Sequence, residues 1–333
     1  MKEKIFIPDR KSIFYINLLT SINKRKEWMD MANQKDGIIG VDIGGTNMRI
    51  GVVGLDGKLL AMHIHSSRLL LSGGRPAETL IELIQKIASE AGTLTLKAIS
   101  VGVPSLVRCD GLAAMSSPNL QALDGVDLVT PLRKTFFCPV YLNKDANLLL
   151  CYTLGQEPEP QKTVAGVYYG TGIGSAVWVN GGLVRGKNGM AGELGHIPFW
   201  GVQEQCACGN RGCAEAVASG KRLEQLCRQY FSQLQIGQVF QAAWPCRELE
   251  RYVDAMACVA AVEVNIFDPD LLVLGGGVVY MPGFPREYLT DCIRCHTRRP
   301  LPAEGLNIRF ASQGQATGIL GAAYYALQAI QQK

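Results

Sequence analysis

The sequence contains no apolar run of the roughly 18 to 20 residues that a membrane-spanning helix requires, so we expect no membrane anchor. Its charge is nearly balanced, with 33 Lys and Arg against 29 Asp and Glu and a net charge of +4. A field this weak argues against nucleic-acid binding. Charged residues are few at 19%, whereas hydrophobic residues reach 47%, which excludes disorder for the chain as a whole. The length of 333 residues suits two domains.

Residues 1–36 differ from the rest of the chain. They are basic and show no clear amphipathic period, and Asn17 interrupts their main apolar run. No small-residue cleavage site follows, so the segment does not read as a secretory signal. We expect a disordered N-terminal extension or a misassigned translation start, with Met29 or Met31 as the alternative start.

From Gly37 onward the two halves of the chain open with the same pattern. Each has a strand, a turn rich in Gly and Thr, a second strand, an Asp-Gly or Asn-Gly turn and a third strand. The copies lie about 126 residues apart, counting Gly44 to Gly170. Two such hairpins facing one cleft can hold the phosphates of a nucleotide, because their turns offer backbone N–H groups. The expected strands cover 38–43, 48–53, 58–64, 163–169, 175–179 and 183–185.

Two glycine-rich stretches imitate other nucleotide motifs. Gly170-x-Gly172-x-Gly174 is not a dinucleotide fingerprint, because a strand follows it where that motif needs a helix. The stretch from Gly181 to Lys187 is not a P-loop, because Asn188 stands where a Ser or Thr should bind magnesium. Each glycine turn alone could be only a hairpin. Together, with Thr46 and Thr171 and with Asp42 just before the first turn, they favour nucleotide binding.

Cysteine spacing gives the strongest single signal. Cys206, Cys208 and Cys213 lie within eight residues, and His196 is ten residues upstream of the first. Three thiolates and an imidazole suit tetrahedral zinc, and a four-ligand site is closed and therefore structural. Three reduced loop thiols are the alternative. The other eight of the eleven cysteines are scattered, which indicates a reducing compartment and predicts a cytoplasmic protein.

For several acids and glycines, the sequence allows either a structural or a functional role. Glu193, His196 and Glu215 flank the cysteine loop and could surround a polyhydroxy substrate, or the acids could be a solvated surface. Asp145 follows a short strand and precedes an apolar helix, so it could be an N-cap or a base facing a cleft. Gly275–Gly277 follow a buried strand and could admit a flat ligand such as adenine, or form only a tight connection.

These motifs, in this order, resemble the ROK family of sugar kinases and related repressors over roughly Gly37 to the C-terminus. The motifs that carry the resemblance are Asp42–Asn47, Gly170–Gly174, Glu193–His196, Cys206–Glu215 and Gly275–Val278. Within the family the chain is most similar to members that phosphorylate D-allose. That finer match depends on Pro104–Ser105, on Lys144 before Asp145, and on the stretches 281–286 and 298–302.

The resemblance implies an α/β, two-domain actin-like ATPase (ribonuclease H-like) fold with an interdomain cleft. It implies a small domain over 37–142, completed by a C-terminal helix at 316–331, and a large domain over 143–315 that carries the zinc loop. It also implies ATP with Mg²⁺ between the glycine hairpins and a structural Zn²⁺. The implied ATP and Mg²⁺ residues are Asp42, Gly44, Gly45, Thr46, Asn47, Gly170, Thr171, Gly172, Gly174, Gly276 and Gly277.

The resemblance further implies that Asp145 is the general base on a sugar hydroxyl, the expected one being the 6-hydroxyl of D-allose. The implied sugar contacts are Asn119, Asp145, Glu193, His196 and Glu215, and the implied zinc ligands are His196, Cys206, Cys208 and Cys213. Lys144 stands where the family commonly has Asn, and Ser105 where it has Gly. These departures bear on the sugar, so glucose, fructose and N-acetylmannosamine remain alternatives to allose.

A sugar-responsive transcriptional repressor is the rival interpretation. Repressors of this family carry a helix-turn-helix domain before the kinase-like part, and residues 1–36 lack two clear amphipathic helices joined by a tight turn. A catalytically dead sugar sensor is also disfavoured, because Asp42 and Asp145 are both present. Relatives imply a homodimer or homotetramer.

Overall fold

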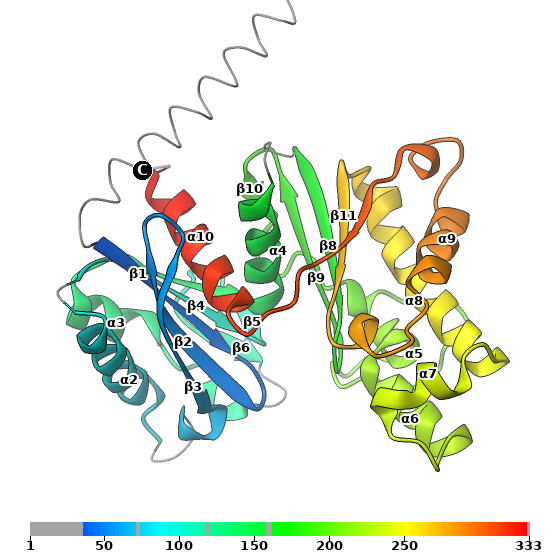
Figure 1. The fold of residues 1–333 in the computed structure, drawn as a ribbon, viewed down its shortest axis with the longest axis horizontal. Helices are drawn as coiled ribbons and strands as arrows, with labels where there is room; N and C mark the ends of the chain where they lie inside the picture. The colour runs from blue at the N-terminus through cyan, green and yellow to red at the C-terminus, as the bar shows by residue number, and fades with distance from the viewer. Residues whose placement is uncertain (1–35, 71–73, 93, 117–119, 158–161, 332–333) are drawn as a thin grey trace, which may run out of the picture.

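The computed structural model describes residues 36–70, 74–92, 94–116, 120–157 and 162–331. The predictions for residues 1–35 and for Asn119 therefore lie outside the described residues. Two five-stranded sheets stand on either side of a pair of helices, and further helices cover the outer faces (Figure 1). Within the described ranges, every helix is too short or too polar to cross a membrane.

The first sheet has the order β3-β2-β1-β4-β7. Its first three strands pair antiparallel, and the last two add in parallel. β1 is buried along nearly its whole length, as expected of a strand covered on both faces. The expected first, second and third strands are confirmed. The bounds are β1 (Asp36–Ile43), β2 (Asn47–Gly54), β3 (Leu59–Ser66), β4 (Thr95–Val103) and β7 (Val140–Lys144).

The second sheet repeats this order as β10-β9-β8-β11-β12. Its strands are β8 (Thr163–Tyr169), β9 (Ile173–Val179), β10 (Gly182–Leu183), β11 (Leu271–Gly275) and β12 (Ile308–Phe310). The internal repeat predicted from the glycine turns is therefore confirmed, because both sheets place an antiparallel hairpin and then two parallel strands in the same sequence. The last strand of the second hairpin is shorter than expected. The chain leaves the sheet near Arg185, which donates to Asn143 Oδ1 at 3.2 Å.

Helices α4 (Asp145–Gln156) and α10 (Thr317–Gln331) lie between the two sheets (Figure 1). Glycine permits their close crossing, since a Cβ on Gly321 would lie 1.9 Å from the carbonyl oxygen of Leu148. α10 also packs on β1 and β4 of the first sheet, and α4 packs on β8 and β9 of the second. The two helices thus connect the sheets through one tight contact.

The outer helices divide between the two sheets. α2 (Pro76–Glu90) confirms the helix expected from apolar periodicity, and it packs with α3 (Val129–Phe136) beside the first sheet. α8 (Arg247–Phe267) and α9 (Arg286–His296) lie beside the second. The remaining elements are short: α5 (Glu215–Ala218), α6 (Gly220–Tyr230), α7 (Val239–Ala243), the hairpin β5 (Leu106–Val107) and β6 (Ala114–Ser116), and 3₁₀ turns at 67–70, 121–123, 194–196, 236–238, 278–280 and 303–305.

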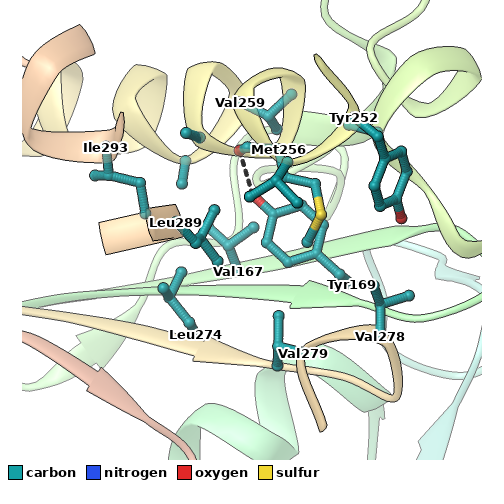
Figure 2. Close-up of a cluster of buried hydrophobic side chains, with 14 of the residues drawn as sticks. Val167, Tyr169, Tyr252, Met256, Val259, Leu274, Val278, Val279, Leu289 and Ile293 are labelled. Carbon is teal, nitrogen blue, oxygen red and sulfur yellow. Dashed lines mark hydrogen bonds between the residues drawn. The ribbon is translucent and has the colours of Figure 1, made fainter. Parts of the chain in front are cut away.

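Tyr169 ends β8 directly before the second glycine turn. Figure 2 shows its ring among the apolar side chains between the second sheet and α8. The side chain is fully buried, and its hydroxyl donates to the carbonyl oxygen of Met256 at 2.6 Å. A buried phenol needs such a partner. This bond holds the end of β8 to α8 and fixes where the turn begins.

Candidate active site and metal loop

The first glycine turn is open to solvent. Gly45, Thr46 and Asn47 are exposed. The turn closes on itself through Gly44 N, which donates to the Asn47 carbonyl oxygen at 2.9 Å. Ser67 holds it from outside, because its hydroxyl donates to the Gly44 carbonyl oxygen at 2.6 Å. The turn is therefore fixed while its tip is free to meet a ligand.

The second glycine turn is packed more tightly. Gly170 N donates to the Gly172 carbonyl oxygen at 3.0 Å. Glu215 lies against the turn, because its Oε2 accepts from Ile173 N at 2.9 Å, and a Cβ on Gly172 would lie 2.3 Å from that oxygen. A side chain at 172 would therefore displace the Glu215 carboxylate from the turn. Glu215, predicted as a sugar contact, has one oxygen already bound to the protein.

Asp42 and Asp145 are brought together from positions about a hundred residues apart. Asp42 lies at the end of β1, and its Oδ2 is 3.4 Å from Arg49 Nη1. Asp145 begins α4, and its Oδ1 accepts from Ala146 N at 2.7 Å. Burial raises the pKa of Asp42 against the lowering effect of Arg49. Burial, reinforced by the negative charge of Asp42, raises the pKa of Asp145 to about 6.

The second turn joins this pair of acids. A Cβ on Gly174 would lie 3.3 Å from the Cβ of Ala146, the residue after Asp145. The start of α4 therefore packs directly against the strand that follows the second turn. The structure thus gathers Asp42, Asp145 and the 170–174 turn at one place between the two sheets.

Lys144 links the acid at 145 to the loop that precedes the cysteines. Its Nζ donates to the Ala191 carbonyl oxygen at 2.7 Å and lies 3.0 Å from Glu193 Oε1. The Lys144 side chain is only 10% exposed and that of Glu193 is 33% exposed, so the lysine end of this ion pair is shielded from water. The sequence marked Lys144 as a departure from the common family pattern and as part of the finer match to D-allose kinases. Its partner could not be found there, because Glu193 is 49 residues away.

His196 lies between this ion pair and the cysteines. Its Nε2 is 3.8 Å from Glu193 Oε2, and its Nδ1 is 3.5 Å from Cys206 Sγ. The two ring nitrogens therefore face different partners. One nitrogen can bind a metal while the other points toward the predicted sugar contacts.

The four predicted zinc ligands converge. One ligand atom from each of His196, Cys206, Cys208 and Cys213 lies within 4.8 Å of the others, and the last two sulfurs are 3.6 Å apart. Tetrahedral zinc with its usual bond lengths would place sulfurs about 3.8 Å apart, and sulfur and nitrogen about 3.5 Å apart. The donor set and its spacing thus fit a zinc ion. Gly209 and Gly212, both with positive φ, allow the loop to fold back on itself.

Gly276 and Gly277 have different surroundings. Gly276 has φ of 91°, and a Cβ there would lie 2.4 Å from the Tyr169 carbonyl oxygen. Glycine is required at 276 by packing against the end of β8. At Gly277 an added Cβ would meet nothing within 4 Å, so that position is open to an approaching ligand.

A small basic cavity beside Lys144 was not foreseen. It has a volume of about 90 Å³. In its wall, Asn143 is 2% exposed and its Nδ2 has no hydrogen-bond partner. The basic residues come from the end of β7, from the loop after β5 and from the loop after β10, and these segments lie far apart in the sequence. The charged lining residues are Arg108, Lys144, Arg185 and Lys187.

Comparison with known proteins places this arrangement in a family. The model of the ROK family matches residues 38–329. The chain belongs to the ROK family. The N-acetyl-D-glucosamine kinase of Pectobacterium carotovorum is 30% identical to it over 315 residues, which cover 85% of this chain and 97% of that enzyme.

Solved ROK structures share the fold. The ROK hexokinase of Thermus thermophilus has a TM-score of 0.75 and 28% identity, covering 89% of this chain and all of that one. A ROK glucokinase of Streptomyces griseus, solved with glucose and AMPPNP, has a TM-score of 0.70 and 24% identity. The match covers 88% of this chain and 99% of that enzyme. The predicted two-domain actin-like ATPase fold is thus confirmed, and the match is to sugar kinases of the ROK family.

Proposed function

We propose that this ROK protein transfers the terminal phosphoryl group of ATP to a hexose hydroxyl, with Asp145 as the general base. The observation that carries the proposal is the meeting of Asp145 and Asp42 beside the second glycine turn. Asp145 is then placed to accept a proton, and Asp42 is placed to orient the Mg²⁺ that binds the phosphates. Phosphoryl transfer depends mainly on such positioning and charge neutralisation.

The proton-accepting role suits the chemistry of Asp145. Its pKa of about 6 is high for an aspartate because of burial and the charge of Asp42. The group is then mostly ionised at pH 7, yet more basic than an exposed aspartate. A base of this strength accepts the hydroxyl proton as the oxygen attacks, and a positioned base contributes about 10²- to 10⁴-fold to the rate.

The nucleotide would lie along the glycine turns. Backbone N–H groups of 44–47 and 170–174 would hold the β- and γ-phosphates, and Asp42 would orient hydrated Mg²⁺. Bound Mg²⁺ would neutralise charge on the transferred phosphoryl group. The open position at Gly277 supports adenosine near that residue, with Gly276 shaping the backbone. AMPPNP in the S. griseus enzyme is consistent with this nucleotide class.

The sugar would be held by the Glu193 and His196 loop together with Asp145, Glu215 and Asn119. Lys144 fixes one oxygen of Glu193, which leaves Oε2 for a sugar hydroxyl. The zinc loop, if metal-bound through His196 Nδ1, would leave Nε2 for a second hydroxyl. We propose D-allose, acting at its 6-hydroxyl. Glucose, fructose, N-acetylmannosamine and the N-acetyl-D-glucosamine of the Pectobacterium relative are the competing sugars.

We further propose a small domain over 37–142 with the helix at 316–331, and a large domain over 143–315. The packing of α10 on β1 and β4 supports assigning that helix to the first. Closure of the two around sugar would exclude water from the phosphate. A cytoplasmic location is supported by the eleven cysteines, all in the described ranges, none of which is in a disulfide. A homodimer or homotetramer can be checked by light scattering.

A coupled ADP-release assay across a hexose panel tests the function. Reduced, zinc-loaded enzyme should turn over ATP with one sugar preferred by kcat/KM, and we expect allose. If none of the sugars in the panel supported ATP consumption, the kinase proposal would be rejected. A gel shift with promoter DNA tests the repressor alternative, for which we expect no retardation.

A further inference from the structure

A second cluster of metal-binding side chains lies on the far side of the second sheet, between α8 and α9. Asp254 and Cys258 belong to α8, and His296 ends α9. One ligand atom from each lies within 4.8 Å of the other two. His296 Nε2 is 2.7 Å from Asp254 Oδ1. The two helices pack on one another, so the three groups are held by the fold and not by one flexible loop.

An ion pair between Asp254 and His296 explains two of the three groups but not the thiol. Asp254 and Cys258 are four residues apart on α8, which puts them on one face of the helix, and that face meets His296. Cys292 stands four residues before His296 on α9 and repeats the spacing. The cluster therefore brings a carboxylate, a thiol and an imidazole to one place between the two helices.

His296 is positioned by bonds outside the cluster. Its carbonyl oxygen accepts from Asn265 Nδ2 at 3.2 Å, and Asn265 Oδ1 accepts from Arg298 N at 2.8 Å. These contacts hold the chain at His296 and just after it against α8. These bonds fix the backbone from which the imidazole of His296 reaches Asp254.

We propose that Asp254, Cys258 and His296 form a second zinc site, independent of the loop at 196–213. A carboxylate oxygen, a thiolate and an imidazole nitrogen are donors that zinc accepts, and three protein ligands leave a fourth position for water. Binding forms a zinc–sulfur bond and releases the Cys258 proton to solvent. The ion joins the end of α9 to the middle of α8. The inference does not depend on the kinase proposal.

Metal counting on the full-length protein tests the site. Protein stripped with a chelator and kept reduced is titrated with Zn²⁺ and analysed by mass spectrometry for bound metal. We expect Cys258→Ser and Asp254→Asn each to bind one equivalent fewer than the wild type. Both changes nearly preserve shape. With Co²⁺, Cys258→Ser should also lose part of the thiolate charge-transfer absorbance.

Cys295→Ser is the matched control, because it makes the same change in α9 at an exposed thiol outside the cluster. It should keep the wild-type count. Cys208→Ser should lose a different equivalent, and the double variant Cys208→Ser/Cys258→Ser should lose both. Unchanged far-ultraviolet circular dichroism of the metal-free variants shows that they fold. Wild-type metal content in both Cys258→Ser and Asp254→Asn would overturn the proposal.

Discussion

Lys144 Nζ lies 3.0 Å from Glu193 Oε1 and is only 10% exposed, so the residue before Asp145 is tied to the loop that carries the predicted sugar contacts. The same ammonium lowers the pKa of Asp145, although burial outweighs it and the pKa is raised overall. The Lys144 side chain therefore has two effects on the proposed site. It holds Glu193 in place, and it limits the rise in the pKa of Asp145.

Replacing Asp145 should remove turnover and spare binding. For Asp145→Asn we expect kcat to fall by at least about 100-fold, because the base is lost. Sugar affinity, measured by calorimetry, should change little. Asp291→Asn, an exposed acid on α9, is the matched control and should keep full activity. Near-normal kcat in Asp145→Asn would show that another group takes the proton.

The rate should depend on pH through Asp145. Since the base must be ionised and its pKa is about 6, kcat/KM should fall about tenfold per pH unit well below 6. The measurement is kcat/KM from pH 4.5 to 8 with the coupling enzymes in excess. A profile that stays flat to pH 5 would exclude Asp145 as the titrating base.

The Asp145 carboxylate should lower the free energy of unfolding at neutral pH. Its folded-state pKa of about 6 lies above the ordinary value of 3.8, so the folded protein binds the proton more tightly than the unfolded chain. Its contribution to stability therefore falls as pH rises from about 4 to 6. Asp145→Asn should raise the free energy of unfolding above pH 6, by at most about 3 kcal/mol. The gain should vanish near pH 4 in urea titrations.

Lys144→Met should separate the two effects of the lysine. Loss of the ion pair frees Glu193, so KM for the sugar should rise by about tenfold or more. Loss of the nearby positive charge should raise the pKa of Asp145, so the acid limb of the pH profile should move upward. A double-mutant cycle with Glu193→Gln isolates the pair. If sugar KM effects add fully in the double variant, the contact has no role in binding.

Cys208→Ser should disconnect the metal loop. We expect zinc affinity to fall by at least about 100-fold, with a lower melting temperature and a higher KM for sugar, because His196 loses its metal partner. Cys109→Ser, also an exposed free thiol, is the control. A variant without this metal that binds sugar normally would show that the loop does not position the sugar contacts.

Neighbouring glycines should respond differently to alanine. Gly276→Ala meets both a positive φ and a backbone oxygen at 2.4 Å, so it should cost at least about 2 kcal/mol of stability. Gly277→Ala meets nothing within 4 Å and should change stability by less than about 0.5 kcal/mol. If adenosine lies there, Gly277→Ala should raise KM for ATP alone. Unchanged kinetics with ATP would show that the adenine does not lie beside Gly277.

Local pattern was enough to predict the repeated hairpins, because strand alternation and the glycines of the turns are properties of neighbouring residues. The cysteine spacing likewise predicted a convergent ligand set, since three of the four ligands lie in one short loop. These signals span few residues, and the fold had little freedom to rearrange them.

Only the tertiary structure decided which distant groups meet. Three pairs of residues join segments that lie far apart along the chain. They are Lys144 with Glu193, Asp42 with Asp145, and Asp254 with His296. These contacts depend on how two sheets pack about α4 and α10, and on burial, which sets the charge state of Asp145. The sequence alone determined the motifs and their order. Long-range packing determined their electrostatics, because burial and charge act through space and not along the chain.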